Sequence, residues 1–400
     1  MTTTPPVPLT AAPPLPLTAA PPLPLTATAL DRIARVIADG ASVVGLGEST
    51  RAAHETFTVR DQLFRRLVRE HGFRALAVQD TADAARALHA YVRRDPDGAP
   101  SAAEALATAW APWRTTEMAA ALDWIRAFND EHADDPVHIF GVKPPQASPA
   151  DYDAVLDHVR VTSPQQLAEV TRHLAPIRTA HQVDEHVQRA RGLHPGRPFA
   201  DHADDALAVV ERLDDGAVLD RMRLIADFHR RSVAGSGTYA GDAEVWGNTI
   251  LEQLRRTGQR VAYWDGIAHT CATPAALGLA PERGSRPTVG SVLRRHHGAA
   301  YVSVAIGFHH GELGTVTVPP PDPDWIDARL ADETARAGWV NLREEGQRPQ
   351  WRGPARLRVI SGVYSTGRDA AEYLAVADLP EAFDVLVHVN RVTPVQGWAS

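Results

Sequence analysis

Acidic, basic and imidazole side chains follow a short apolar segment near the start of the chain, and together they could transfer protons. The segment Ala41–Leu46 is followed within nine residues by Glu48, Arg51, His54 and Glu55. A carboxylate held by an arginine stays ionised, whereas a histidine can accept and return a proton near pH 7. These residue types suit the activation of water or the abstraction of a proton from a substrate.

Three more apolar runs are each followed by polar or ionisable side chains. The runs are 73–78, 137–142 and 261–264, and the side chains after them are Gln79, Asp80, Lys143 and His269. Short apolar runs are typical of buried parallel strands, and ligands of parallel sheets bind beyond the carboxyl ends of the strands. We therefore expect these side chains to meet at one edge of a sheet.

The elements around Glu48 must position these groups. Residues 56–72 carry apolar side chains on one helical face and end on a glycine, as helices do, and Arg60 lies one turn into them, facing Glu48. Gly45 and Gly47 are expected to let the backbone turn sharply. Strands and helices continue to alternate, so we predict an α/β fold with a mostly parallel central sheet, flanking helices and a helical insertion.

Composition divides the chain into four parts. Residues 1–28 hold three near-identical proline-rich octads, which we expect to be disordered and extended, as a linker or as a docking segment for a partner. Residues 29–150 and 236–400 are expected to form the two parts of the α/β core. Residues 151–235 are polar and helix-periodic and predict a helical insertion or lid.

The overall charge and apolar content exclude several classes of partner. The 400 residues are 44% hydrophobic with a net charge of −8 and have no basic run, which argues against a nucleic-acid partner. No apolar run could cross a bilayer and no signal peptide is evident, so we expect a cytoplasmic protein.

The cysteine and histidine content predicts neither a metal site nor another cofactor. The single cysteine, Cys271, cannot form an internal disulfide and is more typical of a small buried residue than of a nucleophile. The adjacent histidines in the pairs 296–297 and 309–310 cannot both face one ion. Of the 41 lysines and arginines only Lys143 is a lysine.

A series of motifs in order along the chain resembles the erythromycin esterase-like family. The motifs are GLGEST at 45–50, HGFRALAVQ at 71–79, AWAPWRTTE at 109–117, LDWIRAFN at 122–129, HIFGV at 138–142, GDAEVWGN with Asp242, AYWDGIAH at 262–269, TVGSVLRRHHG at 288–298 and FDVLVHVNRVTP at 383–394. The resemblance spans about 42–394. It implies a metal-independent hydrolase fold whose resistance members open macrolide lactones with a glutamate, histidines and an arginine around an attacking water.

Four positions differ from the pattern of that family. Arg51 stands where the water-activating histidine of the family aligns, and an arginine cannot act as a base near neutral pH. Gly266 replaces the first histidine of the family motif W-x-H-N-x-H, and His269 retains the second. Gln79 replaces a glutamate and Lys143 an aspartate. Three of these changes add positive charge or remove negative charge, so we expect a more positive pocket and an anionic substrate group.

The residues therefore predict an enzyme that has left macrolide hydrolysis behind. The expected catalytic residues are Glu48, Arg51, Arg60 and His269, with His54 as a candidate replacement base. The expected substrate contacts are Glu55, Gln79, Trp113, Lys143 and Asp242.

Natural-product tailoring is the expected function, on a small molecule or modified peptide that bears an acidic or acyl group. Elimination, cyclisation and ester or lactone chemistry all fit the same acid–base residues. Two other interpretations stay open. One is a genuine macrolide or lactone esterase with His54 or His269 as the base, and the other is a non-catalytic binding protein that retains the fold.

Overall fold

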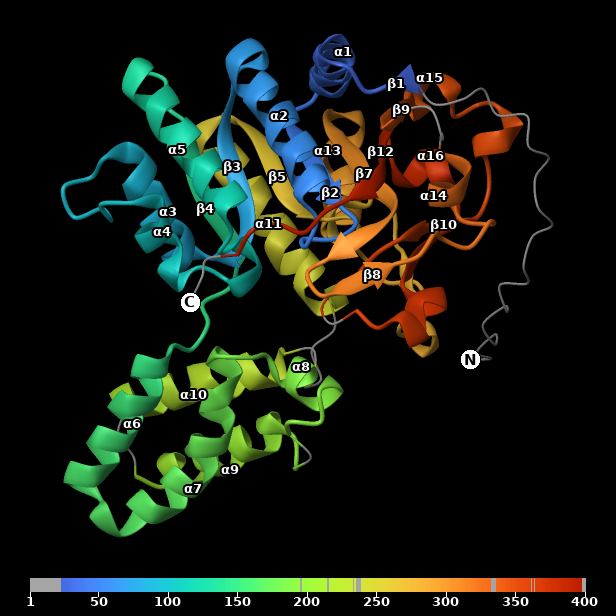
Figure 1. Ribbon diagram of the computed structural model, residues 1–400. Coiled ribbons are helices and arrows are strands. Elements are labelled where there is room, and N and C mark those ends of the chain that lie inside the picture. Colours follow the sequence, from blue (N-terminus) through green and yellow to red (C-terminus); the bar gives the residue numbers. More distant parts are fainter. Residues whose placement is uncertain are drawn as a thin grey trace.

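A mostly parallel β-sheet lies at the centre of the computed structural model (Figure 1). The structure describes residues 23–397 apart from positions 195, 214–215, 233, 235–238, 332–335, 361 and 363. In sheet order the strands are β1 (Leu23–Pro24), β9 (Ala337–Asn341), β12 (Val385–Val392), β7 (Tyr301–Leu313), β2 (Val43–Glu48), β5 (Arg260–Gly266), β3 (Phe73–Thr81) and β4 (His138–Lys143), with β8 (Val316–Val318) on β7. The pairs from β12 to β4 are parallel, which confirms the predicted fold class.

The strand β2 lies in the middle of this sheet and is buried along its whole length. It pairs in parallel with β5 on one side and with β7 on the other, so Glu48 lies level with Gly266 and Ile306. A run of valines and glycines without polar alternation suits a strand that is covered on both faces. The register places Glu48 at the carboxyl edge of the sheet.

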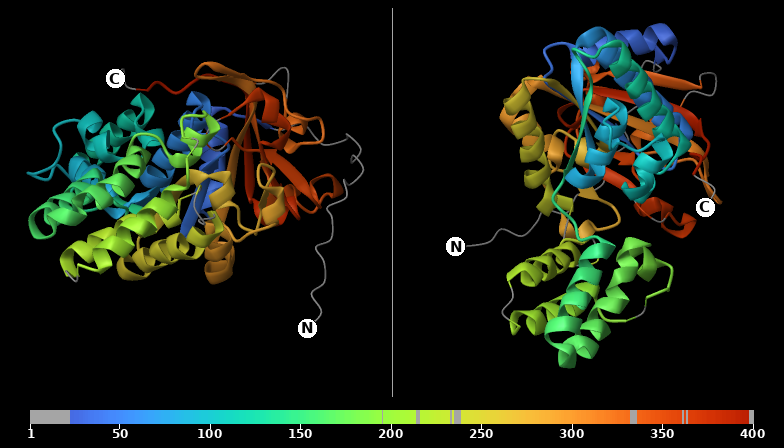
Figure 2. Two further views of the ribbon diagram at one scale, coloured as in Figure 1. Left: turned by 90° about the horizontal axis from the view of Figure 1, so that it is seen from below. Right: turned by 90° about the vertical axis from the view of Figure 1, so that its left-hand side faces the viewer.

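Helices cover both faces of the sheet (Figure 2). One face packs against α1 (Ala27–Ala38), α2 (His54–His71), α3 (Ala82–Arg93), α4 (Ala102–Ala105) and α5 (Thr116–Glu131). The opposite face packs against α11 (Tyr239–Thr257) and α13 (Val289–His297), and beside them lie α12 (Ile267–Thr270), α14 (Ile326–Arg329), α15 (Leu342–Glu345) and α16 (Leu379–Ala382). None of the described helices combines the length and apolarity needed to span a bilayer.

The glycines of β2 serve a different purpose from the one predicted. Gly45 and Gly47 lie inside the strand, not at a turn. A Cβ atom on Gly47 would lie 3.0 Å from the Cα of Ile267 and would overlap the side chain of Thr270. The missing side chains therefore allow α12 to approach the strand closely.

Two other sequence expectations need correction. Residues 1–22 of the proline-rich segment lie outside the described residues, but Leu23–Pro24 form the edge strand β1 and α1 begins at Ala27. Proline is tolerated there because an edge strand leaves one side without a partner. The alternation of strands and helices also predicts that the run 357–362 belongs to the main sheet, but its first residues lie in β10 (Ala355–Arg358). This strand forms a separate antiparallel sheet with β11 (Tyr373–Val376) and β6 (Ala276–Leu277).

A helical body follows β4 and returns to the core through α11. Its helices are α6 (Pro149–Thr162), α7 (Leu167–Ile177), α8 (Glu185–Ala190), α9 (Phe199–Glu211) and α10 (Gly216–Arg230), and they enclose a hydrophobic cluster of their own. Figure 1 shows this body below the sheet, apart from the core helices. Because it starts after the carboxyl end of β4, it lies on the same side as Glu48. We call it the lid.

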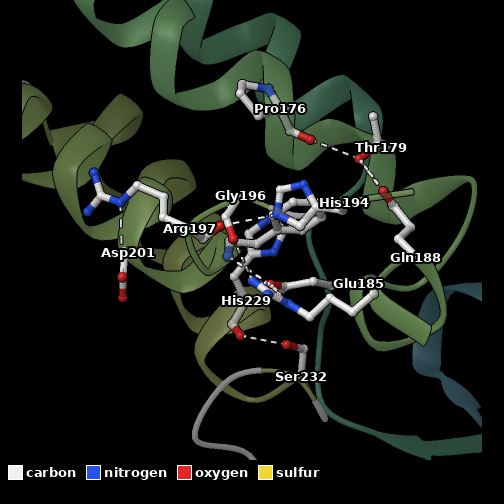
Figure 3. Close-up of polar contacts among 12 residues, drawn as sticks. Pro176, Thr179, Glu185, Gln188, His194, Gly196, Arg197, Asp201, His229 and Ser232 are labelled. Carbon is white, nitrogen blue, oxygen red and sulfur yellow. Dashed lines mark hydrogen bonds and ion pairs between the residues drawn. The ribbon is translucent and has the colours of Figure 1, made fainter. Parts of the chain in front are cut away.

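A buried carboxylate joins the helices of the lid (Figure 3). Glu185 is 3% exposed and accepts hydrogen bonds from Arg189 at 2.9 and 3.0 Å and from the backbone N–H of Phe199 at 3.0 Å. Nearby, the hydroxyl of Tyr152 lies 2.7 Å from Nε2 of His229, which links α6 to α10. These contacts fix the lid internally.

Candidate active site

A buried ion pair between Glu48 and Arg60 forms the centre of the site. Nη1 of Arg60 lies 2.7 Å from Oε1 of Glu48, and both side chains are at most 1% exposed. Beyond this contact, Oε2 of Glu48 and the Nε and Nη2 atoms of Arg60 have no hydrogen-bond partner among the described residues. Buried polar atoms are normally satisfied. The unused hydrogen-bonding capacity of this pair therefore points to a bound ligand or water.

The guanidinium of Arg51 bridges the next two strand ends. Its Nη2 donates to the carboxylate of Asp265 and to Oε1 of Gln79. Asp265 is fully buried and also accepts from the hydroxyl of Tyr263 and from the N–H of Gly266 at 2.6 Å. Arg51 is therefore held in place by a carboxylate that three donors orient.

Each of the two arginines of the site is paired with a buried carboxylate. The cation at Arg51 is balanced by Asp265, and that at Arg60 by Glu48. Arg51 nevertheless keeps donor capacity, since its buried Nε has no partner among the described residues. It can still bind an acidic group, but as part of a balanced cluster.

Gly266 provides the space that Arg51 occupies. A Cβ atom at position 266 would lie 3.4 Å from Nη1 of Arg51 and 3.8 Å from Nη2. An alanine would therefore touch the guanidinium, and any longer side chain that points the same way would have to displace it. Arginine at 51 and a histidine at 266 compete for the same volume.

Two cations contact the indole of Trp110. The guanidinium carbon of Arg51 lies 4.8 Å from the ring centre, and Nζ of Lys143 lies 4.2 Å from it. Asp80 anchors this loop because its carboxylate accepts the backbone N–H of Trp110 at 2.7 Å. The aromatic loop thus brings the ends of β2, β3 and β4 together.

His269 lies in α12, which follows β5 directly. Its ring is 4% exposed and lies 5.0 Å from the ring of Trp246. Burial lowers the pKa of His269, with Asp265 opposing this shift and Arg51 adding to it. The imidazole is therefore neutral at pH 7 and able to accept a proton.

Burial shifts the proton affinity of Glu48 in the opposite direction. Burial raises the pKa of Glu48, while Arg60 and Arg51 oppose this rise. A carboxyl group with a raised pKa and an imidazole with a lowered pKa at one edge of a sheet are an arrangement that supports acid–base catalysis. Arg51 and Asp265 influence the titration of both groups, so the two lie in one electrostatic cluster.

His54 and Glu55 make contacts that are separate from the Glu48–Arg60 pair. Nδ1 of His54 lies 2.8 Å from Glu117, and its side chain is 47% exposed. Glu55 accepts hydrogen bonds at 2.6 and 2.7 Å from Thr393. On a helix these positions are rotated by about 120° and about 140° from Arg60. Both residues thus hold the C-terminal segment, away from the face that Arg60 presents to Glu48.

The other predicted substrate contacts lie around the cluster. Trp113 is 1% exposed, and its indole N–H donates to the backbone oxygen of Gln79 at 3.3 Å. Its ring centre lies 5.1 Å from the guanidinium carbon of Arg60, so the indole is a packing residue beside the ion pair. Asp242 lies in the first turn of α11 and interacts electrostatically with Lys143. The predicted site omitted Asp265 and Trp246. Asp265 ends a buried strand as Glu48 does, which is a signal that the sequence contained.

A second buried polar cluster lies behind α12. Asp327, Arg358 and His388 line a cavity of about 10 Å³, together with Ile267 of α12. The N–H of Arg358 donates to Asp327 at 2.6 Å, and Nε2 of His388 lies 3.7 Å from the same carboxyl group. Burial raises the pKa of Asp327 to about 6 and lowers that of His388 to about 3. The cavity has room for roughly one water molecule.

No metal site is present in the described part of the chain. No group of three or more histidine, cysteine, aspartate or glutamate side chains there could hold an ion. His309 and His310 instead contact each other, with 2.9 Å between their Nδ1 atoms.

Comparisons with known proteins agree with the fold. Residues 68–392 match the sequence profile described as erythromycin esterase, a range that begins within α2 and so excludes Glu48, Arg51 and Arg60. No protein with a curated description matches the sequence.

Three solved structures share the architecture over nearly the whole chain. A Bacillus cereus protein is 19% identical with a TM-score of 0.62, and 94% of each chain is covered. A succinoglycan biosynthesis protein is 20% identical with a TM-score of 0.62, with 94% of this chain and 95% of that chain covered. A mutant of the erythromycin esterase EreC in its open conformation is 16% identical with a TM-score of 0.57, with coverage of 92% and 95%. At these identities the likeness concerns the fold alone.

Proposed function

The chain belongs to the erythromycin esterase family, and we propose that it is an enzyme whose chemistry has changed from that of a macrolide esterase. The proposed substrate is a small molecule or modified peptide with an acidic or acyl group. Glu48 and His269 exchange protons with this substrate, Arg60 positions Glu48, and Arg51 stabilises the anion that develops during the reaction.

The observation that carries this proposal is the guanidinium of Arg51 at the edge of the sheet. It is fixed by Asp265 and Gln79 and lies in the space that Gly266 leaves open. A guanidinium cannot take a proton from water near neutral pH, but its planar fork suits a carboxylate or a developing oxyanion. Elimination, cyclisation or acyl chemistry is therefore favoured over simple water activation at this position.

A comparison of carboxylic acids with neutral relatives tests the role of Arg51. We expect carboxylic acids of natural-product intermediates to raise the melting temperature, and their methyl esters to leave it unchanged. Arg51→Gln should abolish the difference. Equal shifts with acids and esters would contradict the proposal.

Turnover assays with erythromycin and simple esters test the change of chemistry. We expect little hydrolysis of erythromycin, followed as product mass by chromatography, and efficient hydrolysis would instead establish the esterase alternative, which family membership favours. For any substrate that is turned over, Glu48→Gln should abolish the reaction. Glu252→Gln, on the exposed face of α11, is the matched control. Full activity in Glu48→Gln would rule out the proposed role of this carboxyl group.

A further inference from the structure

Lys143 occupies an unusual position for a lysine. It is the last residue of β4, at the carboxyl edge where Glu48 also lies, and its side chain is half-buried. Its Nζ lies 4.2 Å from the ring centre of Trp110 and 6.0 Å from that of Trp246. Among the described residues no hydrogen bond or ion pair to Lys143 is present. The amine therefore lies beside two indole rings, and no acceptor among the described residues binds its N–H groups.

Charged groups from several elements face this amine at longer range. They are Asp80 of β3, Asp265 of β5, Arg51 after β2, Asp184 before α8 of the lid and Asp242 of α11. Burial is the largest influence and lowers the pKa of Lys143, while Asp80 and Asp265 oppose this shift. The indole rings favour the charged ammonium through cation–π interactions. The rate at which the amine reacts at pH 7 shows whether burial or the acidic and aromatic neighbours dominate the pKa of Lys143.

We propose that Lys143 is a nucleophilic amine that forms an imine with the aldehyde or ketone carbonyl of a small carboxylic acid. Arg51 and Lys143 both lie within 5 Å of the ring centre of Trp110 and interact electrostatically, so one small acid can have its carboxylate at Arg51 and present its carbonyl to Nζ. A lysine that is desolvated and close to another cation is a recognised form of activated nucleophile. The ligand class is therefore a 2-oxo acid or a related carbonyl-bearing acid.

The proposed step balances without any further reactant. The nitrogen lone pair forms a bond to the carbonyl carbon, and one nitrogen proton passes to the carbonyl oxygen to give a carbinolamine. The carbon–oxygen bond then breaks, the oxygen leaves as water with the second nitrogen proton, and a C=N bond to Lys143 remains. No oxidation or reduction occurs. This inference rests on the proposed binding of a carboxylate at Arg51, but not on the acid–base roles of Glu48 and His269.

Reductive trapping tests the proposal directly, since the chain contains a single lysine. The full protein is incubated at pH 7 with glyoxylate and cyanoborohydride, alongside Nα-acetyllysine amide as a free-lysine reference. Peptide mass spectrometry then gives the labelling rate at Lys143. We expect it to exceed that of the reference, because a larger fraction of an amine with a lowered pKa is unprotonated at pH 7. Lys143→Arg should give no lysine label, and circular dichroism checks its fold.

Two comparisons decide the outcome. Labelling of Lys143 that is slower in the native protein than in the chain unfolded by guanidinium would overturn the proposal, whereas faster native labelling supports it. Acetaldehyde has no carboxylate and should label the native protein more slowly than glyoxylate, after correction for their rates with the reference amine. Arg51→Gln should remove this preference, and its persistence would overturn the assignment of the carboxylate to Arg51.

Discussion

Arg51 links the two groups proposed to transfer protons, because it interacts electrostatically with both Glu48 and His269. Its own position depends on Asp265, which is buried and fully used as an acceptor. A side chain that influences two titrating groups must be held rigidly to act reproducibly. Asp265 is therefore the residue through which small structural changes reach the rest of the cluster.

Because Asp265 anchors Arg51, we expect two substitutions that introduce no charge to lower the free energy of unfolding by different amounts. Asp265→Asn removes the charge that balances Arg51, so we expect a loss of about 2–4 kcal/mol in the free energy of unfolding. Tyr263→Phe removes one hydrogen bond to the same carboxylate and should cost about 1 kcal/mol. Urea denaturation measures both. Equal losses would show that Asp265 has no special role in neutralising Arg51.

At the scale of elements, the close packing of α12 on β2 sets the distance between His269 and Glu48. The strand has no side chain at Gly47, and Thr270 fills that space. The first turn of α12 can therefore lie directly against the strand. A change in this packing would move His269 without altering any ionisable residue.

Repacking of this contact provides a test at the same scale. Gly47→Ala should destabilise the protein by about 1–3 kcal/mol, because the new methyl group overlaps Thr270. Thr270→Ala removes the opposing hydroxyl, so the double variant should recover part of that loss. A double-mutant cycle by thermal denaturation measures the coupling. Strictly additive effects would mean that the two side chains do not compete for space.

The elements differ in how far the sequence could predict them. The unit β2–α2–β3 was predictable because its signals are local: a continuous apolar run, a helical stripe and Gly72 in the left-handed region at φ 68°. The strands β1, β6, β10 and β11 have two to four residues, too few for a period to show. Their pairing depends on partners that are distant in sequence.

The site was predictable only in part for the same reason. Glu48 and Arg60 are twelve positions apart, and strand and helix geometry alone brings them together. Arg51 is held by Asp265, which lies more than two hundred residues away in the sequence. The positive charge of Arg51 was therefore predictable from the sequence, but its pairing with the carboxylate of Asp265 was not. His54 looked suitable by residue type, yet the helix turns it towards Glu117.

At the scale of the whole molecule, the second polar cluster makes stability depend on pH. The folded pKa of Asp327, about 6, lies above its ordinary value of 3.8. At Asp327 the folded state therefore binds more protons than the unfolded chain between these values, so the contribution of this residue to stability falls as the pH rises through the window. Since one pKa unit corresponds to about 1.4 kcal/mol, the loss is roughly 3 kcal/mol. His388 of the same cluster contributes in the opposite direction, because burial lowers its pKa to about 3. Glu372, whose pKa burial raises to about 7, extends the fall towards neutrality.

Removal of the Asp327 charge tests this dependence. Between pH 4 and pH 7 the free energy of unfolding of the wild type should fall by roughly 2–3 kcal/mol relative to that of Asp327→Asn. Asp83→Asn, whose side chain is 73% exposed in the wild type, serves as the matched control. The free energy of unfolding is measured by urea titration at each pH. Parallel profiles for Asp327→Asn and the wild type would contradict the assignment.

The lid has a hydrophobic cluster separate from those of the core, which predicts that it folds alone. A fragment of residues 147–232 should have a helical circular dichroism spectrum and unfold cooperatively on heating. A disordered spectrum would show that α6–α10 depend on the sheet. A fragment of similar length from the central sheet, residues 43–131, should be unfolded because its strands lose their partners β5 and β7.

The shared space of Arg51 and Gly266 also constrains the route by which such a site could arise or be engineered. If a histidine already filled position 266, an arginine introduced at 51 would find no room for its guanidinium. The reverse order is open, because glycine at 266 leaves only a small void that a later arginine can fill. The path between the two arrangements is therefore directional: the loss of a side chain at 266 has to precede the new one at 51. A library that varies position 51 alone, on a background with histidine at 266, would miss this solution.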